Sequence, residues 1–231
     1  MGLHGKYRAL VSLALGLWAT GGAAETCRLA LLIGMDISSS VDAHEDRLQR
    51  QGLAAALRHP DVQEAALALP NQPVAISVFE WSGRWQQDLV ADWRLIRTPA
   101  DLGLLGDDVS ASRRSYADFP TAVGYALGYA RTRFDAAPDC LFQTLDLSGD
   151  GRNNEGFEPD LAYRHFDFSN ITVNGLPILE ENKDVEVYYT QKILHGPGAF
   201  AEVAERFEDI EHAMTRKLVR ELGVSILGTL R

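Results

Sequence analysis

The chain has 231 residues, of which 46% are hydrophobic, and a formal net charge of −10 at pH 7. This length is enough for one domain with a well-packed core. So strong an excess of acidic residues argues against nucleic acid and anionic membrane surfaces as binding partners.

The N-terminal segment has the pattern of an export signal. Lys6 and Arg8 provide a basic start, an apolar stretch follows at residues 9–19, and small residues then form a cleavage motif. The stretch is shorter than the about 20 apolar residues that a membrane span requires, and no later segment is long and apolar enough either. We therefore predict that residues 1–24 are a signal peptide, and that residues 25–231 form one periplasmic or secreted domain.

Two cysteines, Cys27 and Cys140, remain after the predicted cleavage. In an exported protein an even count of two favours one disulfide. The alternative is a lipid-anchored Cys27, because this residue lies just after the signal. Glu25 and Thr26 in front of it are poor residues for that processing.

Strand-like and helix-like segments alternate along the first half of the domain. Their apolar patterns, turns and caps predict, in order, a buried strand at residues 29–35, a helix at 43–58, a strand at 74–81, an antiparallel edge strand at 85–93 and a helix at 98–109.

The second half continues this alternation. Residues 186–194 are apolar and aromatic enough to be ordered, but their pattern favours neither type of element. The predicted elements are a helix at residues 120–134, a strand at 141–147, a short helix at 161–166, a strand at 171–179, a last strand at 199–203 and a long amphipathic helix at 206–222.

Such alternation predicts an α/β fold: a doubly wound, mostly parallel sheet with helices on both faces and one antiparallel edge strand. In sheets of this kind ligands bind beyond the carboxyl ends of the strands, at the switch point of the topology. The loops after Met35 and Leu147 are therefore where a functional site is expected.

The loop after the first strand is rich in side-chain oxygen atoms. In its sequence DISSS, Asp36, Ser38 and Ser40 are spaced two residues apart, so in a nearly extended chain all three point to the same side. The alternative is an ordinary helix N-terminus, in which Ser40 or Asp42 caps the helix that follows.

Two later loops offer more oxygen atoms. Asp150 follows the strand at 141–147 in the sequence SGDG, whose glycines allow a tight turn, and Thr121 lies at the expected start of a helix. Hydroxyls and carboxylates without histidine or thiolate ligands suit a hard divalent cation such as Mg²⁺, Mn²⁺ or Ca²⁺.

This combination resembles the von Willebrand factor A domain and its metal ion-dependent adhesion site (MIDAS). That site has the pattern Asp-x-Ser-x-Ser, then a Thr in a later loop, then an Asp-Gly after a central strand. Asp36, Ser38, Ser40, Thr121 and Asp150 match it in order and spacing. More narrowly, the segments LIGMDISSSVD, LDLSGDGRNN, TVNGLPI, HGPGAF and RKLVREL resemble a family of exported bacterial proteins with this domain.

The resemblance implies that the three hydroxyls ligate a divalent cation directly, with Mg²⁺ expected first and Mn²⁺ or Ca²⁺ as alternatives. The two carboxylates would hold bound waters or ligate the cation directly. One open coordination position would then take an acidic side chain of a partner protein. This sequence departs from the commoner pattern at Gly149, where a Thr often precedes the Asp. The difference affects the backbone geometry where the strand ends, rather than the set of ligand residues.

The resemblance also places the two cysteines. In this domain the strands that follow Cys27 and Cys140 are parallel neighbours, so both cysteines lie at the end of the sheet opposite the metal site, within bridging distance.

We therefore interpret the chain as an exported module that binds another protein through a divalent cation and is not an enzyme. The alternative is a metal-dependent hydrolase in which the same cation activates water, although no residue stands out as its general base. A third interpretation is a site that holds metal only for structure.

Overall fold

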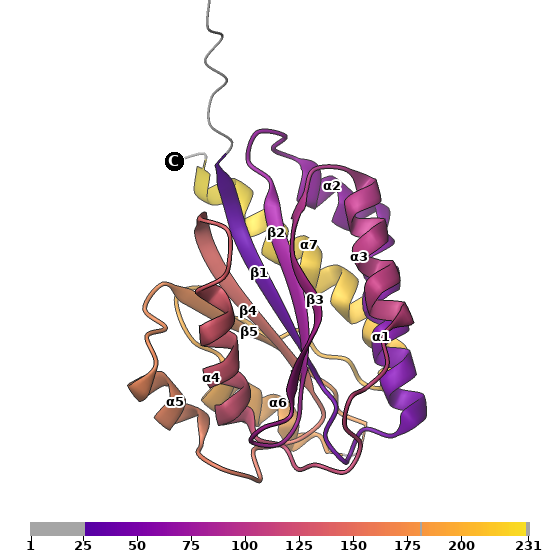
Figure 1. Ribbon diagram of the computed structural model, residues 1–231, viewed down its shortest axis with the longest axis vertical. Helices are drawn as coiled ribbons and strands as arrows, with labels where there is room; N and C mark the ends of the chain where they lie inside the picture. Colours follow the sequence, from indigo (N-terminus) through magenta and orange to yellow (C-terminus); the bar gives the residue numbers. More distant parts are fainter. Residues whose placement is uncertain (1–25, 181, 230–231) are drawn as a thin grey trace, which may run out of the picture.

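The computed structural model describes residues 26–180 and 182–229, and the predicted signal peptide lies outside these residues. In this part of the chain one sheet has the strand order β3-β2-β1-β4-β5 (Figure 1). Neighbouring strands are parallel, except that β2 and β3 are antiparallel. The strands are β1 (Cys27–Asp36), β2 (Val74–Trp81), β3 (Gln87–Ile96), β4 (Cys140–Gly149) and β5 (Ile171–Pro177).

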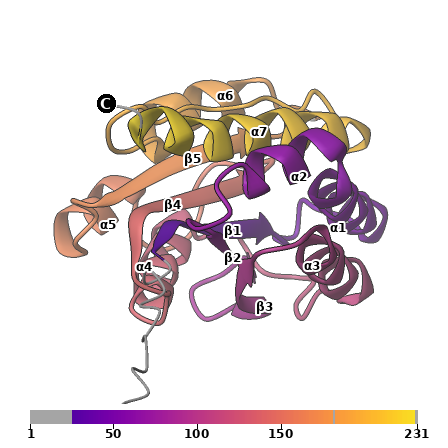
Figure 2. The ribbon, with the colours of Figure 1, turned by 90° about the horizontal axis from the view of Figure 1, so that it is seen from above.

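Helices cover both faces of this sheet. One face packs into a core with α1, α2, α3 and α7, and the other with α4, α5 and α6. Figure 2 shows α7 and α4 on opposite sides of the strands. The helices are α1 (Ala43–Arg58), α2 (Pro60–Leu67), α3 (Pro99–Ala111), α4 (Val123–Phe134), α5 (Pro159–His165), α6 (Asp184–Tyr188) and α7 (Ile210–Thr229).

This arrangement confirms the predicted fold class, and local sequence explains much of it. Every residue of β1 is buried, as expected for a central parallel strand with helices on both faces. The edge strand β3 is only partly buried. Asp42 caps α1 in a capping box with Glu45, and the residue after α1, His59, caps α2 with Pro60 at its first position. The separate helix α2 was not predicted.

Several predicted limits and one predicted strand were wrong; the edge strand expected at residues 85–93, for example, is β3 (Gln87–Ile96). The helix expected from residue 120 begins at Val123, because the chain before it is held in a loop. Residues 199–203 form no strand, and only isolated bridges such as Gly175 to Ala201 join this segment to the sheet. The helix expected from residue 206 is preceded by a 3₁₀ turn (Phe207–Asp209), and α7 itself begins at Ile210.

The predicted disulfide is confirmed. Cys27 and Cys140 are joined by a disulfide, and their Cα atoms lie 4.4 Å apart. The pair lies at the start of β1 and β4, opposite the carboxyl ends of these strands. Cys27 therefore has no free thiol for a lipid anchor.

A buried cluster of charges links β4 to α7. Lys217 Nζ lies 3.1 Å from Asp146 Oδ1 and 2.7 Å from Glu221 Oε1, and the side chains of all three residues are buried. Burial is the main cause that raises the pKa of Asp146 to about 7, and Glu221 raises it further whereas Lys217 lowers it.

None of the helices in the described residues combines the length and apolar character needed to cross a membrane.

A candidate metal site at the carboxyl ends of β1 and β4

The oxygen-rich loops lie at the switch point of the sheet. From β1 the chain goes first to β2 and β3 on one side, and later to β4 and β5 on the other. Asp36 is the last residue of β1, and Asp150 directly follows β4. The carboxyl ends of both strands lie at the bottom of Figure 1. Because β1 and β4 are parallel neighbours, the topology brings the two carboxylates to the crevice where such folds bind ligands.

Hydrogen bonds draw four of the five predicted residues together. Ser38 N donates to Asp36 Oδ1 (2.8 Å), and the hydroxyls of Ser38 and Ser40 are 3.2 Å apart. Ser40 Oγ donates to Asp150 Oδ1 at 2.8 Å, across 110 positions of sequence. Asp36 and Ser38 are buried, whereas Ser40 is exposed. The site is therefore reached from solvent on the side of Ser40.

Thr121, in the loop before α4, lies next to the loop that carries Asp150. Its N–H donates to Asn154 Oδ1 (2.8 Å), and its carbonyl oxygen accepts from Asn154 N (2.9 Å) and Glu155 N (3.2 Å). A Cβ added at Gly151, the residue after Asp150, would lie 3.5 Å from Thr121 Oγ1. The hydroxyl of Thr121 thus lies beside the loop that carries Asp150, although Thr121 does not begin a helix.

The capping interpretation does not account for these residues. The side chain of Asp42 accepts hydrogen bonds from His44 N (2.6 Å) and Glu45 N (2.9 Å), which satisfies the start of α1. The hydroxyl of Ser40 is directed to Asp150 instead. Neither Asp36 nor Ser40 is needed to cap α1, so their convergence needs another explanation.

The electrostatics of the site fit a bound cation. Asp36 Oδ2 is buried and has no hydrogen-bond partner among the described residues. Burial and, next, the charge of Asp150 raise the pKa of Asp36 to about 8. Two carboxylates that repel each other, one with an unmatched oxygen, and three nearby hydroxyls form a donor set that suits a hard divalent ion.

A site of the histidine or cysteine type is not found. In the described part of the chain, no group of three or more His, Cys, Asp or Glu side chains is arranged to hold a metal ion. Any cation at the switch point therefore depends on serine and threonine hydroxyls as well as on carboxylates.

Two polar residues that sequence reasoning missed support the loops. Gln49 of α1 donates from Nε2 to the carbonyl oxygen of Asp36 (2.9 Å), and its Oε1 accepts from Ser148 Oγ (2.9 Å). Arg114 donates to the carbonyl oxygens of Ile37 and Val41, at 2.7 Å each. A buried Gln in an amphipathic helix is a weak sequence signal, and the loop position of Arg114 gives none.

Tyr189 also belongs to this region, and its place explains Gly149. Tyr189 opens a π-helical turn (Tyr189–Ile193), and its buried hydroxyl has no partner among the described residues. A Cβ at Gly149 would lie 2.7 Å from both Asp36 Oδ2 and Tyr189 Oη, which is closer than side chains approach. Glycine at this position therefore allows the Asp36 carboxylate and the Tyr189 hydroxyl to approach the end of β4.

An exposed aromatic side chain lies on a turn connected to the site. Trp85 is 78% exposed in the turn between β2 and β3, and its ring centroid lies 5.9 Å from that of Tyr125. The N–H of Ala122, next to Thr121, donates to the carbonyl oxygen of Ser82 at the start of this turn (2.8 Å). The turn with Trp85 thus packs against the loop of Thr121.

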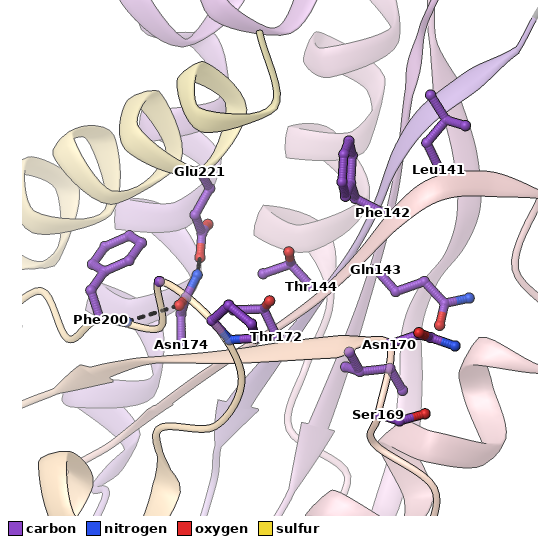
Figure 3. Close-up of a pocket in the computed structure, with 13 residues that line it drawn as sticks. Leu141, Phe142, Gln143, Thr144, Ser169, Asn170, Thr172, Asn174, Phe200 and Glu221 are labelled. Carbon is purple, nitrogen blue, oxygen red and sulfur yellow. Dashed lines mark hydrogen bonds between the residues drawn. The ribbon is translucent and has the colours of Figure 1, made fainter. Parts of the chain in front are cut away.

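A separate cavity of about 490 Å³ lies away from these loops. Figure 3 shows it between the early part of β4, with Phe142 and Thr144, and Glu221 of α7. Asn174 Nδ2 donates to Glu221 Oε1 at 2.7 Å on its wall. Because Phe142 precedes Asp150 by most of the length of β4, this cavity is not part of the candidate metal site.

Among known families, the profile of one described as "Protein of unknown function (DUF1194)" matches residues 26–226. No curated protein matches the sequence.

Solved structures with the same fold include proximal thread matrix protein 1 from the mussel byssus with a zinc-occupied MIDAS motif (TM-score 0.64, 17% identity, 85% of this chain and 48% of that chain). A von Willebrand factor type A structure from Catenulispora acidiphila has a TM-score of 0.59 at 16% identity, over 86% of this chain and 43% of that chain. The pilus adhesin SpaC from Lactobacillus rhamnosus GG has a TM-score of 0.58 at 12% identity, over 85% of this chain and 31% of that chain. The chain thus has a von Willebrand factor A-like fold and spans less than half the length of these proteins.

Proposed function

We propose that this chain, which belongs to the family described as protein of unknown function (DUF1194), is an exported, non-enzymatic module that binds another protein through a divalent cation. The observation that carries the proposal is the Ser40–Asp150 hydrogen bond at the switch point. It lies beside the buried Asp36 carboxyl group, whose Oδ2 accepts no hydrogen bond from the described residues. These groups come from separate loops and leave excess negative charge where the fold binds ligands.

Five side chains would hold the cation: Asp36, Ser38, Ser40, Thr121 and Asp150. Mg²⁺ is the first expectation, with Mn²⁺ or Ca²⁺ as alternatives, because all five offer hard oxygen atoms. When bound, the cation supplies positive charge between the carboxylates and an open position for an acidic side chain of the partner. In this proposal the carboxylates of Asp36 and Asp150 balance the charge of the cation, directly or through bound waters, and the exposure of Ser40 leaves the open position accessible.

Exposed aromatic residues beside the site support a protein as the partner. Trp85 is 78% exposed and Phe119 is 37% exposed. The carbonyl oxygen of Phe119 accepts a hydrogen bond from Ser39 N (2.8 Å), which ties it to the loop of the predicted ligands. Aromatic side chains supply much of the binding energy in protein interfaces.

Two further facts support the proposal. The disulfide Cys27–Cys140 suits an oxidising compartment, in agreement with the predicted export signal and a periplasmic or secreted location. The mussel protein with a zinc-occupied MIDAS motif and the pilus adhesin SpaC share the fold of this chain.

The test has two measurements. Calorimetric titration of Mg²⁺ and Mn²⁺ into the apo protein should give saturable binding, and no binding at millimolar concentration would reject the proposal. Capture of periplasmic proteins by the immobilised chain should then depend on Mg²⁺ and be lost with a chelator. Release of a processed product from the captured material would favour the alternative, a metal-dependent hydrolase at the same site.

A further inference from the structure

A second cavity, of about 360 Å³, lies between the start of α1 and the chain that leaves α3. Four arginines line it, and the only acidic residue in its lining is Asp46. The arginines are Arg47 and Arg50 on α1 and Arg113 and Arg114 after α3. A lining of this kind is notable in a chain whose formal net charge is −10.

This arginine pocket adjoins the candidate metal site. Arg114 donates from Nη1 to the carbonyl oxygen of Val41 and from Nη2 to that of Ile37, at 2.7 Å each. It also donates from Nε to the carbonyl oxygen of Tyr116 (2.8 Å). The guanidinium therefore lies against the loop that carries Ser38 and holds that loop through backbone carbonyl oxygens, and its positive charge also acts on the Asp36 carboxylate.

Arg50 is held in ion pairs, whereas Arg47 and Arg113 form none with the described residues. Arg50 forms ion pairs with Asp46 and Glu80, and all three side chains are buried. Arg47 and Arg113 are exposed. Among the described residues, neither has a carboxylate oxygen within ion-pairing distance, although Arg47 lies 3.4 Å from His44 Nδ1. The pocket thus combines a fixed, ion-paired Arg50 with the exposed guanidinium groups of Arg47 and Arg113, which are open to a ligand.

From this arrangement we propose that the arginine pocket binds an acidic peptide segment of the partner protein, adjacent to the side chain that approaches the metal site. The inference rests on the proposed function and extends it by naming the chemistry of the partner. Guanidinium groups pair with carboxylates in a forked geometry that suits Asp and Glu side chains. Because the chain has a formal net charge of −10, an acidic segment is repelled by most of the protein surface. The arginine pocket therefore sets where and in which orientation the segment binds.

The probe is a fluorescein-labelled oligoglutamate peptide, with binding followed by fluorescence anisotropy at low salt with Mg²⁺. The double variant Arg47→Glu/Arg113→Glu should bind it about tenfold more weakly than the wild type, because attraction is replaced by like-charge repulsion. The matched control is Arg164→Glu/Arg206→Glu, which changes the net charge equally at two exposed positions outside the pocket. This control should change binding by no more than about twofold, since exposed charges are screened over distance.

Equal affinity of the pocket variant and the wild type would overturn the inference, as would a wild type that does not bind the peptide. Tighter binding of a labelled single-stranded DNA than of oligoglutamate would overturn it as well. Calorimetry with Mg²⁺ separates the two proposals, since the pocket variant should keep the Mg²⁺ affinity of the wild type. Peptide binding that needs the arginines, in a protein that calorimetry shows to bind no Mg²⁺ or Mn²⁺, would retain the pocket and reject the metal-dependent function.

Discussion

Cys27 and Cys140 face each other in register across β1 and β4, and the disulfide between them lies at the opposite end of the same strand pair from Asp36 and Asp150. The covalent link therefore fixes the alignment of the two strands whose carboxyl ends form the candidate metal site. A one-residue slip of β4 against β1 would move Asp150 away from Ser40, because side chains alternate between faces along a strand.

Removing this disulfide should lower stability strongly. The double variant Cys27→Ser/Cys140→Ser should lose about 4 kcal/mol of unfolding free energy, because the bridge closes a long loop in the unfolded chain. The two cysteines are 113 positions apart. Urea denaturation of the apo protein measures this loss, and wild type kept in reductant should behave like the variant. Equal stability with and without the bridge would contradict the prediction.

Asp36→Asn should abolish Mg²⁺ binding without lowering the stability of the apo protein. The substitution keeps the shape of the side chain but removes a carboxyl group whose charged form is disfavoured in the apo protein by burial and by Asp150. Calorimetry measures the metal affinity, and urea denaturation with a chelator measures stability. Asp42→Ala is the control: loss of the α1 cap should cost about 1 kcal/mol while Mg²⁺ affinity stays unchanged. A variant at position 36 that binds like the wild type would remove Asp36 from the site.

Gly149→Ala should weaken Mg²⁺ binding and lower stability by about 1–3 kcal/mol, as overpacked positions do. The added Cβ would lie 2.7 Å from Asp36 Oδ2 and from Tyr189 Oη, so the carboxylate has to move. Gly151→Ala provides a matched control, because its Cβ would meet Thr121 Oγ1 at an ordinary 3.5 Å. Calorimetry and urea denaturation of both variants check this expectation, and equal effects at the two positions would refute it.

Titration of Asp146 should contribute to the pH dependence of the unfolding free energy. Its pKa is about 7 in the folded protein, against an ordinary value of 3.8. Between these values the folded state binds more protons than the unfolded state, so this group makes the unfolding free energy fall as pH rises. With a chelator present, wild type should lose more stability between about pH 5 and about pH 8 than Asp146→Asn does. Parallel losses in the two proteins would contradict the prediction.

Trp85→Ala should reduce the chelator-sensitive capture of partner proteins while stability changes by no more than about 0.5 kcal/mol, as is usual for surface positions. The side chain is 78% exposed, so its removal leaves no cavity in the core. Leu104→Ala on α3, 54% exposed, is the matched control and should capture as well as the wild type. Full capture by the Trp85 variant would exclude this turn from the interface.

The sequence by itself determined the features that depend on neighbouring residues. The limits of α1 (Ala43–Arg58) and β2 (Val74–Trp81) agree with their prediction, because apolar periodicity, capping and proline act within a few residues. The count of two cysteines favoured a disulfide over a lipid anchor, and the family resemblance placed the two residues at neighbouring strand starts. The two-residue spacing of Asp36, Ser38 and Ser40 likewise marked the loop after β1 as a candidate site.

The resemblance already assigned Thr121 and Asp150 to that site, but only the tertiary structure revealed the contacts between its loops and the residues that support them. Ser40 and Asp150 meet across 110 positions, and Tyr189 reaches Gly149 from a segment whose pattern favoured neither helix nor strand. Arg114 supports the loop of Ser38 through backbone carbonyl groups, which carry no sequence signal. Such contacts follow from strand order and from the packing of loops at one edge of the sheet, and these depend on the whole chain rather than on local pattern.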